Sequence, residues 1–147
     1  LINENLSIKS NIFRKLFISR RTSGNPRLEN QNNVEQIFAD NGYEMIFPEL
    51  MSFVEKLKVF SEAKIIAGVY GAGFTNILFA NNNVKIICIQ PKAIEWPWIS
   101  NIAGILSQQC YFLDALLSKE TPFRYYQNSF KLDEEYLRKF LNQFEGD

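Results

Sequence analysis

Short apolar runs alternate with helix-like patterns along the whole chain, and this alternation constrains the fold more than any other feature. Near-continuous apolar runs predict buried strands, and apolar residues that recur every three or four positions predict helices. Strands are predicted at 15–19, 43–47, 64–69, 84–90 and 110–113. Helices are predicted at 29–41, from Ser52 to about Phe60, at 74–80, at 95–109 and at 133–144. The second of these begins with a capping-box pattern, Ser52 with Glu55 three residues on, and its predicted apolar face is Phe53, Leu57 and Phe60. The chain therefore alternates strand and helix from end to end.

Strands that are apolar throughout are typical of a parallel sheet with helices on both faces. Right-handed crossovers make 2-1-3-4-5 the simplest order for five strands, which is a doubly wound, Rossmann-like α/β fold. A length of 147 residues fits one domain, so the whole of 1–147 is expected to form it. In such a sheet, ligands bind beyond the carboxyl ends of the strands, at the point where the order reverses. That point lies between the first and third strands.

Composition excludes several classes of function. Lys plus Arg and Asp plus Glu are 16 each, so no bulk attraction to nucleic acid is expected. No apolar run approaches the ~18 residues of a membrane span, so no membrane insertion is expected in this segment. Histidine is absent, and there is no Asp-x-Asp pair, so neither a metal nor another cofactor is predicted. Cys88 and Cys110 lie in predicted strands, where free buried thiols are the usual state.

The third predicted strand, 64–69, runs into the turn Tyr70-Gly71-Ala72-Gly73 and then into a helix. Glycines let the backbone approach a ligand closely, and the first N–H groups of a helix attract anions. Thr75 and Asn76, in the first helical turn, could add side-chain hydrogen bonds. The alternative is that both glycines serve only to pack the helix tightly on the strand, with Asn76 capping locally.

Arginines form a second candidate for anion binding. Arg20 and Arg21 directly follow the first predicted strand, and Arg27 lies further along the same loop. Guanidinium forks match the oxygens of a phosphate or diphosphate. Alternatively, these arginines are solvated charges or pair with Glu29 or Glu49. Because the predicted strand order sets this loop beside the glycine turn, we expect a diphosphate site between 20–27 and 70–76.

Four stretches in order, "FISRRTSGNPRLENQ", "FPELMSFVEKLKVFSEAKIIAG", "GAGFTNILFA" and "VKIICIQP", give the chain a family resemblance. From about 15 to 91 it resembles the carboxyl-terminal half of glycosyltransferase family 61, which includes capsular-polysaccharide biosynthesis proteins. Positions typical of the family are occupied by Arg20, Arg27, Asn30, Gly71, Ala72, Gly73 and Asn76. The chain departs from the pattern at Tyr70, where the family has His, and at Gln31 and Cys88, where it has Glu.

The resemblance implies a GT-B architecture of two Rossmann-like halves and inverting sugar transfer. This chain would be the half that binds the nucleotide-sugar donor, here a UDP-sugar. Its partners would be a glycan acceptor and an amino-terminal domain that is missing, since the chain starts at Leu1 rather than Met. A bacterial protein of this kind would be cytoplasmic or peripheral to the membrane, and a eukaryotic one would lie in the secretory-pathway lumen.

No catalytic residue is predicted. A general base must lie close to the acceptor hydroxyl, and the resemblance implies that the acceptor lies between this chain and the other half of the protein. Glu49 and Asp114 follow the second and fifth strands, and Glu95 follows the fourth as a candidate ribose partner. Each can equally be a solvated charge, so the base is expected in the upstream domain. Trp96-Pro97-Trp98 would stack on a base or sugar, or simply pack.

Two other functions remain open. The first is a degenerate nucleotide-binding or interaction module without transfer, which the replacements at Tyr70 and Cys88 favour. The second is another Rossmann-like enzyme such as a sugar epimerase, which the missing G-x-G-x-x-G fingerprint disfavours.

Overall fold

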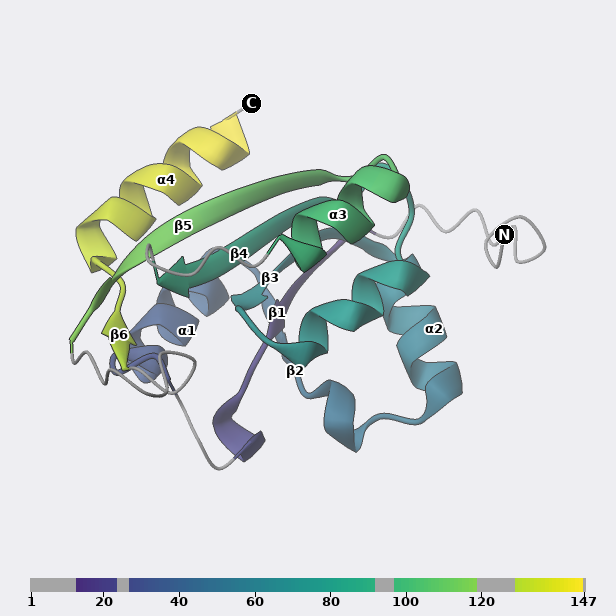
Figure 1. Cartoon of the computed structure of the whole chain (residues 1–147), viewed down its shortest axis with the longest axis horizontal. Helices are drawn as coiled ribbons and strands as arrows, with labels where there is room; N and C mark the ends of the chain where they lie inside the picture. Colours follow the sequence, from purple (N-terminus) through teal and green to yellow (C-terminus); the bar gives the residue numbers. More distant parts are fainter. Residues whose placement is uncertain (1–12, 24–26, 92–96, 119–128, 147) are drawn as a thin grey trace.

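A six-stranded sheet in the order β2-β1-β3-β4-β5-β6 forms the centre of the molecule (Figure 1). The computed structural model describes residues 13–23, 27–91, 97–118 and 129–146. Within these ranges the strands are β1 (Arg14–Ile18), β2 (Glu44–Ile46), β3 (Ala63–Val69), β4 (Lys85–Pro91), β5 (Gln109–Leu117) and β6 (Phe130–Lys131). Neighbouring strands from β2 to β5 pair in parallel, whereas β6 pairs antiparallel with β5.

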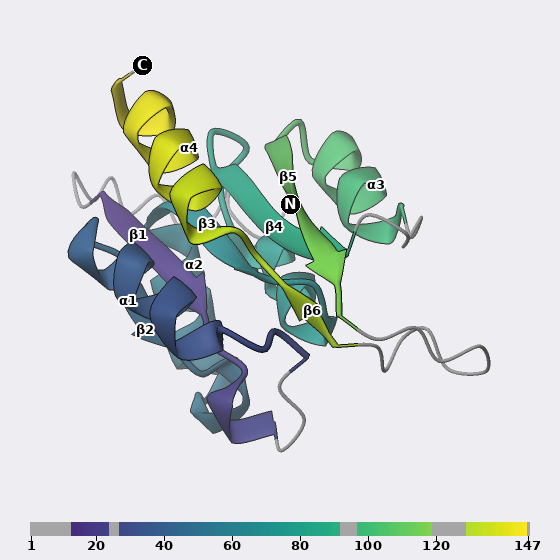
Figure 2. The ribbon, with the colours of Figure 1, turned by 90° about the vertical axis from the view of Figure 1, so that its left-hand side faces the viewer.

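The predicted α/β class is confirmed, and the five parallel strands have the predicted order. The predicted number of strands is wrong, because β6 adds a sixth (Figure 2). Only Phe130 and Lys131 belong to β6, and they pair with Leu117 and Leu116. Two residues are too few to show a period along a sequence, so no local pattern could predict this strand.

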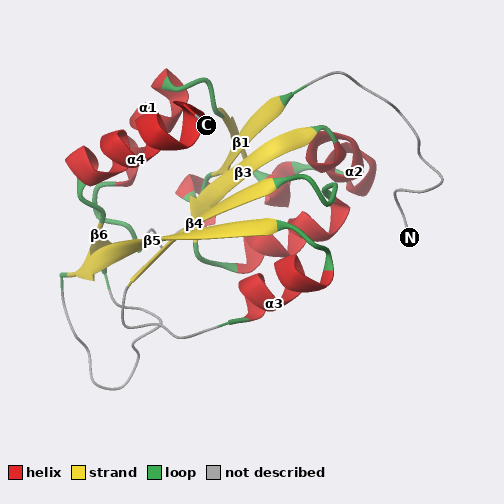
Figure 3. Cartoon of the chain, turned by 90° about the horizontal axis from the view of Figure 1, so that it is seen from above, coloured by secondary structure: helices red, strands yellow, loops and turns green. Residues whose placement is uncertain are grey.

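Helices cover both faces of the sheet, as predicted (Figure 3). One face carries α1 (Gln31–Asp40) and α4 (Glu134–Gly146), and the other carries α2 (Phe53–Ser61), α3 (Trp98–Ile105) and η3 (Ala72–Phe79), a 3₁₀ helix. Two shorter 3₁₀ turns, η1 (Arg21–Ser23) and η2 (Pro48–Leu50), follow β1 and β2. Successive side chains of β1 alternate between the faces, with Leu16 in one core and Phe17 in the other. Burial on both faces explains why the central residues of β1, β3 and β4 form nearly unbroken apolar runs.

The start of α2 differs partly from its prediction. The predicted capping box is confirmed, because the Glu55 carboxylate accepts the Ser52 N–H at 2.7 Å and Ser52 Oγ accepts the Glu55 N–H at 3.2 Å. The predicted apolar face is wrong at its first position. Phe60 is fully buried, but Phe53 is 62% exposed, with its ring against Phe79 at 5.6 Å between centroids. Periodicity identifies a face but not how far the neighbouring layer extends over it.

The fifth strand is longer than predicted and runs from Gln109 to Leu117. Asp114 therefore lies inside β5, exposed at its surface, and does not follow the strand as predicted. The polar residue interrupts the apolar pattern on the exposed side without ending the ladder, because Gln90 of β4 still pairs with it. The helix predicted at 95–109 is shorter, since α3 spans only Trp98–Ile105.

Both cysteines are free thiols, as predicted. Cys88 is completely buried in β4, and Cys110 is partly buried in β5. Burial raises the pKa of Cys110 to about 11 and raises that of Cys88 as well. Both thiols therefore stay protonated at neutral pH and act as small apolar side chains. No helix within the described ranges is long and apolar enough to cross a membrane.

Candidate functional site: a cationic pocket at the carboxyl edge

A pocket of about 800 Å³ opens at the carboxyl ends of β1 and β3. This is the point where the strand order reverses, because β2 lies on one side of β1 and β3 lies on the other. Open α/β sheets bind ligands at such a point. Eight of the ten predicted site residues line the pocket: Arg20, Arg27, Tyr70, Gly71, Ala72, Gly73, Thr75 and Asn76. The arginine loop and the glycine turn, about 50 residues apart in sequence, are thus brought together as the strand order predicted.

Arg20 reaches across the pocket to the glycine turn. Its Nη1 donates a hydrogen bond of 3.1 Å to the carbonyl oxygen of Tyr70. A Cβ atom placed on Gly71 would lie only 1.9 Å from the same Nη1. Gly71 therefore provides the space that the guanidinium of Arg20 occupies.

Gly73 has a different role. A Cβ atom at this position would lie 2.8 Å from Cγ2 of Ile18, the last residue of β1. Its small size lets η3 pack closely on the end of the strand. The helix-packing interpretation therefore applies to Gly73, whereas Gly71 makes room for Arg20, and the close approach of a ligand to this turn stays a prediction.

Positive charge is concentrated in the pocket. Burial lowers the pKa of Arg20, and the nearby positive charge of Arg27 lowers it further, while the negative charge of Glu49 acts in the opposite direction. The Nε of Arg27 is buried and has no hydrogen-bond partner among the residues that the structure describes. Lys56, from α2, adds a third cationic side chain. A bound anion would reduce the repulsion between the guanidinium groups and would accept hydrogen bonds from them.

Thr75 and Asn76 use their side-chain donors within η3. Thr75 Oγ1 donates to the Ala72 carbonyl and Asn76 Nδ2 to the Gly73 carbonyl, each at 2.8 Å. The side chain of Asn76 therefore makes a local hydrogen bond, as the alternative to ligand binding predicted. What the start of η3 offers to a ligand is its first backbone N–H groups, which have no carbonyl of the helix to bond.

The remaining two predicted residues, Arg21 and Asn30, lie outside the pocket. Arg21 forms an ion pair with Glu35 of α1, at 2.8 Å between Nε and Oε2. An ion pair was one interpretation of this arginine, but the partner is neither Glu29 nor Glu49. Asn30 exchanges two hydrogen bonds with the backbone of Leu132, at 2.8 and 3.2 Å, and so connects the start of α1 to the segment before α4.

Among the acidic candidates, only Glu49 lines the pocket, and its carboxylate accepts a hydrogen bond from the Thr22 hydroxyl. Asp114 is not among the lining residues, and Glu95 lies outside the described residues. Within the described part of the chain, no group of three or more His, Cys, Asp and Glu side chains could hold a metal ion.

Two pocket residues carried little indication in the sequence. Lys56 lies on the amphipathic helix α2, where a lysine is normally a solvated charge. Trp98 begins α3, and its Nε1 donates to the Tyr70 hydroxyl at 3.3 Å, with 6.3 Å between the ring centroids. The proline-flanked tryptophans at 96–98 were the only hint of this aromatic wall, and Trp96 lies outside the described residues.

The fold and the pocket together define an α/β protein with a cationic site at the switch point of its sheet. The chain belongs to the family described as Glycosyltransferase 61, whose model matches residues 1–87. That region contains every residue lining the pocket except Trp98. Among curated proteins, the comparison found no match.

Proposed function

We propose that this chain is the donor-binding domain of a glycosyltransferase and holds a UDP-sugar in the pocket. The observation that carries the proposal is that Arg20 and Arg27 line one pocket with the glycine turn, where Arg20 donates a hydrogen bond to the Tyr70 carbonyl. Two guanidinium groups that line one pocket suit a diphosphate, whose oxygens accept bidentate hydrogen bonds. Membership of a glycosyltransferase family makes a nucleotide-sugar the fitting diphosphate.

The diphosphate would lie between the two arginines and the first amides of η3, with Lys56 adding charge. Trp98 and Tyr70 form an aromatic wall against which the base or the sugar would pack. Tyr70, in the position where the family has His, would keep a hydroxyl but no positive charge. Because cationic side chains supply the compensating charge, donor binding would not need a metal.

The rest of the proposal concerns the whole protein. We propose an inverting reaction in a GT-B architecture of capsular-polysaccharide type, with this Rossmann-like domain as the carboxyl-terminal half. An amino-terminal domain would bind the glycan acceptor and provide the general base. The location would be the cytoplasm or the membrane periphery in a bacterium, or the secretory-pathway lumen in a eukaryote.

A nucleotide-binding module without transfer activity is the second candidate. Glu49 is the one carboxylate among the described residues that line the pocket, and it is already bonded to Thr22. Cys88, in the position where the family has Glu, is buried in β4. These observations favour a domain that holds the nucleotide without taking part in chemistry.

Calorimetry on the 147-residue chain tests donor binding. We expect UDP and a UDP-sugar to bind more tightly than UMP, and equally well with excess EDTA. Arg20→Ala should weaken UDP binding by about 1.5–3 kcal/mol, the contribution of a hydrogen bond to a charged group. Arg138→Ala, which removes an exposed arginine from α4, is the matched control and should leave affinity unchanged. Equal affinity for both variants would contradict the proposal, and a strict Mn²⁺ or Mg²⁺ requirement would contradict its metal-independent form.

A transfer assay separates donor binding from catalysis. With the base expected in another domain, this chain should bind the donor and transfer no sugar, with slow hydrolysis at most. Transfer by the 147-residue chain that Glu49→Gln or Asp114→Asn abolishes would make the chain a complete enzyme and overturn this division of roles.

A further inference from the structure

A buried carboxylate lies directly behind the arginine loop. Glu35, on α1, is only 4% exposed. Its Oε1 accepts hydrogen bonds from Ser19 Oγ at 2.5 Å and from Gln31 Nε2 at 2.9 Å, and its Oε2 pairs with Arg21 Nε at 2.8 Å. A carboxylate is costly to bury unless donors compensate it, and this one has three.

Two of these three donors belong to the loop that carries Arg20. Ser19 precedes Arg20, lines the pocket and accepts the Arg21 N–H on its Oγ at 3.3 Å. Arg21 follows Arg20, and its guanidinium also lies over the Phe47 ring. Glu35 thus holds the residues on both sides of Arg20, while Arg20 itself extends to the Tyr70 carbonyl.

We propose that Glu35 is a positioning residue that fixes Arg20 in the pocket before the ligand arrives. The proposal rests on the proposed function, since Arg20 is the group that would contact the diphosphate. With Ser19 and Arg21 both bound to one buried carboxylate, the loop between them has few conformations left. The entropy of ordering Arg20 is then lost during folding rather than during binding, and this raises affinity.

The arrangement also explains why two adjacent arginines have different positions. The ion pair with Glu35 holds the Arg21 side chain against α1, away from the pocket. Arg20 is the arginine of the two that lines the pocket. Without the carboxylate, Arg21 would be a second mobile cation beside Arg20.

A double-mutant cycle tests this role, with UDP as the probe. We expect Glu35→Gln to weaken UDP binding roughly threefold to tenfold, the cost of ordering one flexible side chain on binding. In an Arg20→Ala background the same change should have no further effect, because Glu35 acts through Arg20. An equal loss in both backgrounds, or no loss in the wild type, would overturn the proposal.

The matched control is Glu62→Gln, which breaks another partly buried Arg–Glu pair, at the opposite end of β1. It should lower the melting temperature as Glu35→Gln does, yet leave UDP affinity unchanged. If Glu35→Gln does not fold, Arg21→Gln breaks the same network from its exposed side and should show the same coupling to Arg20. Lower affinity in Glu62→Gln as well would mean that general stability, not positioning, controls binding.

Hydrogen exchange of the free protein distinguishes failure of this inference from failure of the proposed function. Amides 20–22 should exchange faster in Glu35→Gln than in the wild type, while those of β4 should not change. A wild type that does not bind UDP would refute the proposed function, and the exchange result would still decide whether Glu35 holds the loop. Unchanged exchange at 20–22 would overturn the positioning role.

Discussion

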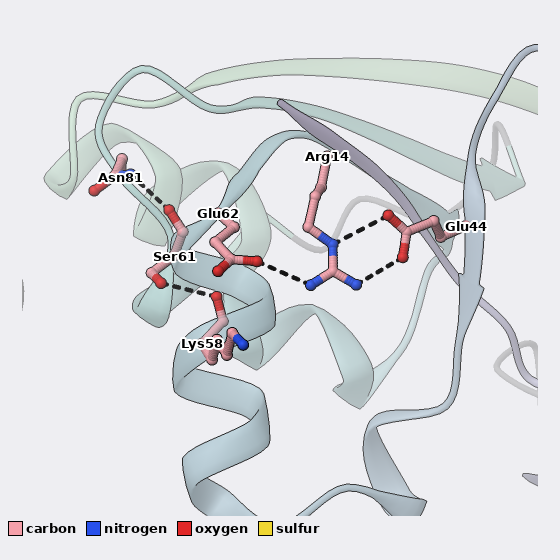
Figure 4. A network of polar contacts seen from close by, with 6 residues as sticks. All are labelled: Arg14, Glu44, Lys58, Ser61, Glu62 and Asn81. Carbon is pink, nitrogen blue, oxygen red and sulfur yellow. Dashed lines mark hydrogen bonds and ion pairs between the residues drawn. The ribbon is translucent and has the colours of Figure 1, made fainter. Parts of the chain in front are cut away.

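The two ends of β1 carry arginines in opposite electrostatic surroundings. At the amino end, Arg14 donates two hydrogen bonds to Glu44 of β2, at 3.0 and 2.6 Å, and one to Glu62 after α2, at 3.0 Å (Figure 4). These bonds raise the pKa of Arg14, with the hydrogen bond to Glu44 as the largest cause. Just beyond the carboxyl end, burial and the charge of Arg27 lower the pKa of Arg20.

The opposite pKa shifts distinguish an arginine that stabilises the fold, Arg14, from one that is available for function, Arg20. The charge of Arg14 is neutralised by two carboxylates, on β2 and just after α2, so its interactions already stabilise the folded protein. Arg20 is placed beside a like charge at a cost in stability. Such unfavourable placement is typical of functional sites, because a ligand removes the cost when it binds.

The largest expected effect is on binding. Replacing both Arg20 and Arg27 with Ala should weaken UDP binding at least 10- to 150-fold, which corresponds to about 1.5–3 kcal/mol per charged hydrogen bond. Removing the two like charges relieves their repulsion and also loses the hydrogen bond from Arg20 to Tyr70, so the unfolding free energy should change by less than about 0.5 kcal/mol in either direction. Calorimetry and urea unfolding measure the two quantities. A large loss of stability would mean that this end of β1 is as structural as the other.

Gly71→Ala should move Arg20 without replacing it. Its Cβ would overlap the end of the flexible Arg20 side chain, and alanine is strained at the φ of +158° found there. Arg20 and the turn therefore shift, and UDP affinity falls roughly tenfold, close to the lower effect of losing one charged hydrogen bond. Gly104→Ala is the matched control, because nothing lies within 4 Å of the added Cβ. It should leave affinity unchanged and stabilise α3 by about 0.5–1 kcal/mol. Unchanged affinity in Gly71→Ala would remove Arg20 from the binding site.

Arg14→Ala should have the reverse signature of the pocket variants. It leaves the partly buried carboxylate of Glu62 without its guanidinium, so the free energy of unfolding should fall by about 1–2 kcal/mol. UDP affinity should not change. Thermal unfolding and calorimetry on the same preparation measure both. Weaker UDP binding by folded Arg14→Ala would show that the two ends of β1 are coupled, and the comparison would fail.

The smallest effect concerns pH. The hydrogen bond from Arg14 is the main reason why the pKa of Glu44 lies below its usual value. A carboxyl with a lowered folded pKa adds stability above its unfolded pKa, and this stability is lost as pH falls through the folded value. Glu44 is half exposed, so wild type should exceed Glu44→Gln by only about 0.2–1 kcal/mol at pH 7. The gap in unfolding free energy should close as pH falls through the lowered pKa of Glu44, and a gap that persists well below that pKa would exclude ionisation as its source.

Patterns within single segments predicted most of the fold. Leu16 and Phe17 pack into cores on opposite faces, so the run from Leu16 to Ile18 in β1 is apolar without a break, and this is visible without a structure. The exceptions are features that depend on a neighbour. Phe53 has a core-like position in its helix yet is 62% exposed. The two-residue β6 is held by its pairing with β5 and by backbone hydrogen bonds of Phe130 with Arg27 and Glu29.

The alternation of strands and helices was enough to predict the layered α/β class and the order of the parallel strands. That order was enough to bring the arginine loop and the glycine turn to one edge. Only the tertiary structure decided which arginine enters the pocket. Arg20 and Arg21 are adjacent and chemically identical, so no local pattern distinguishes them. The missing side chain of Gly71 leaves room for Arg20, and the buried carboxylate of Glu35 draws Arg21 away. Both causes lie on segments distant in sequence, and they act only once the chain has folded.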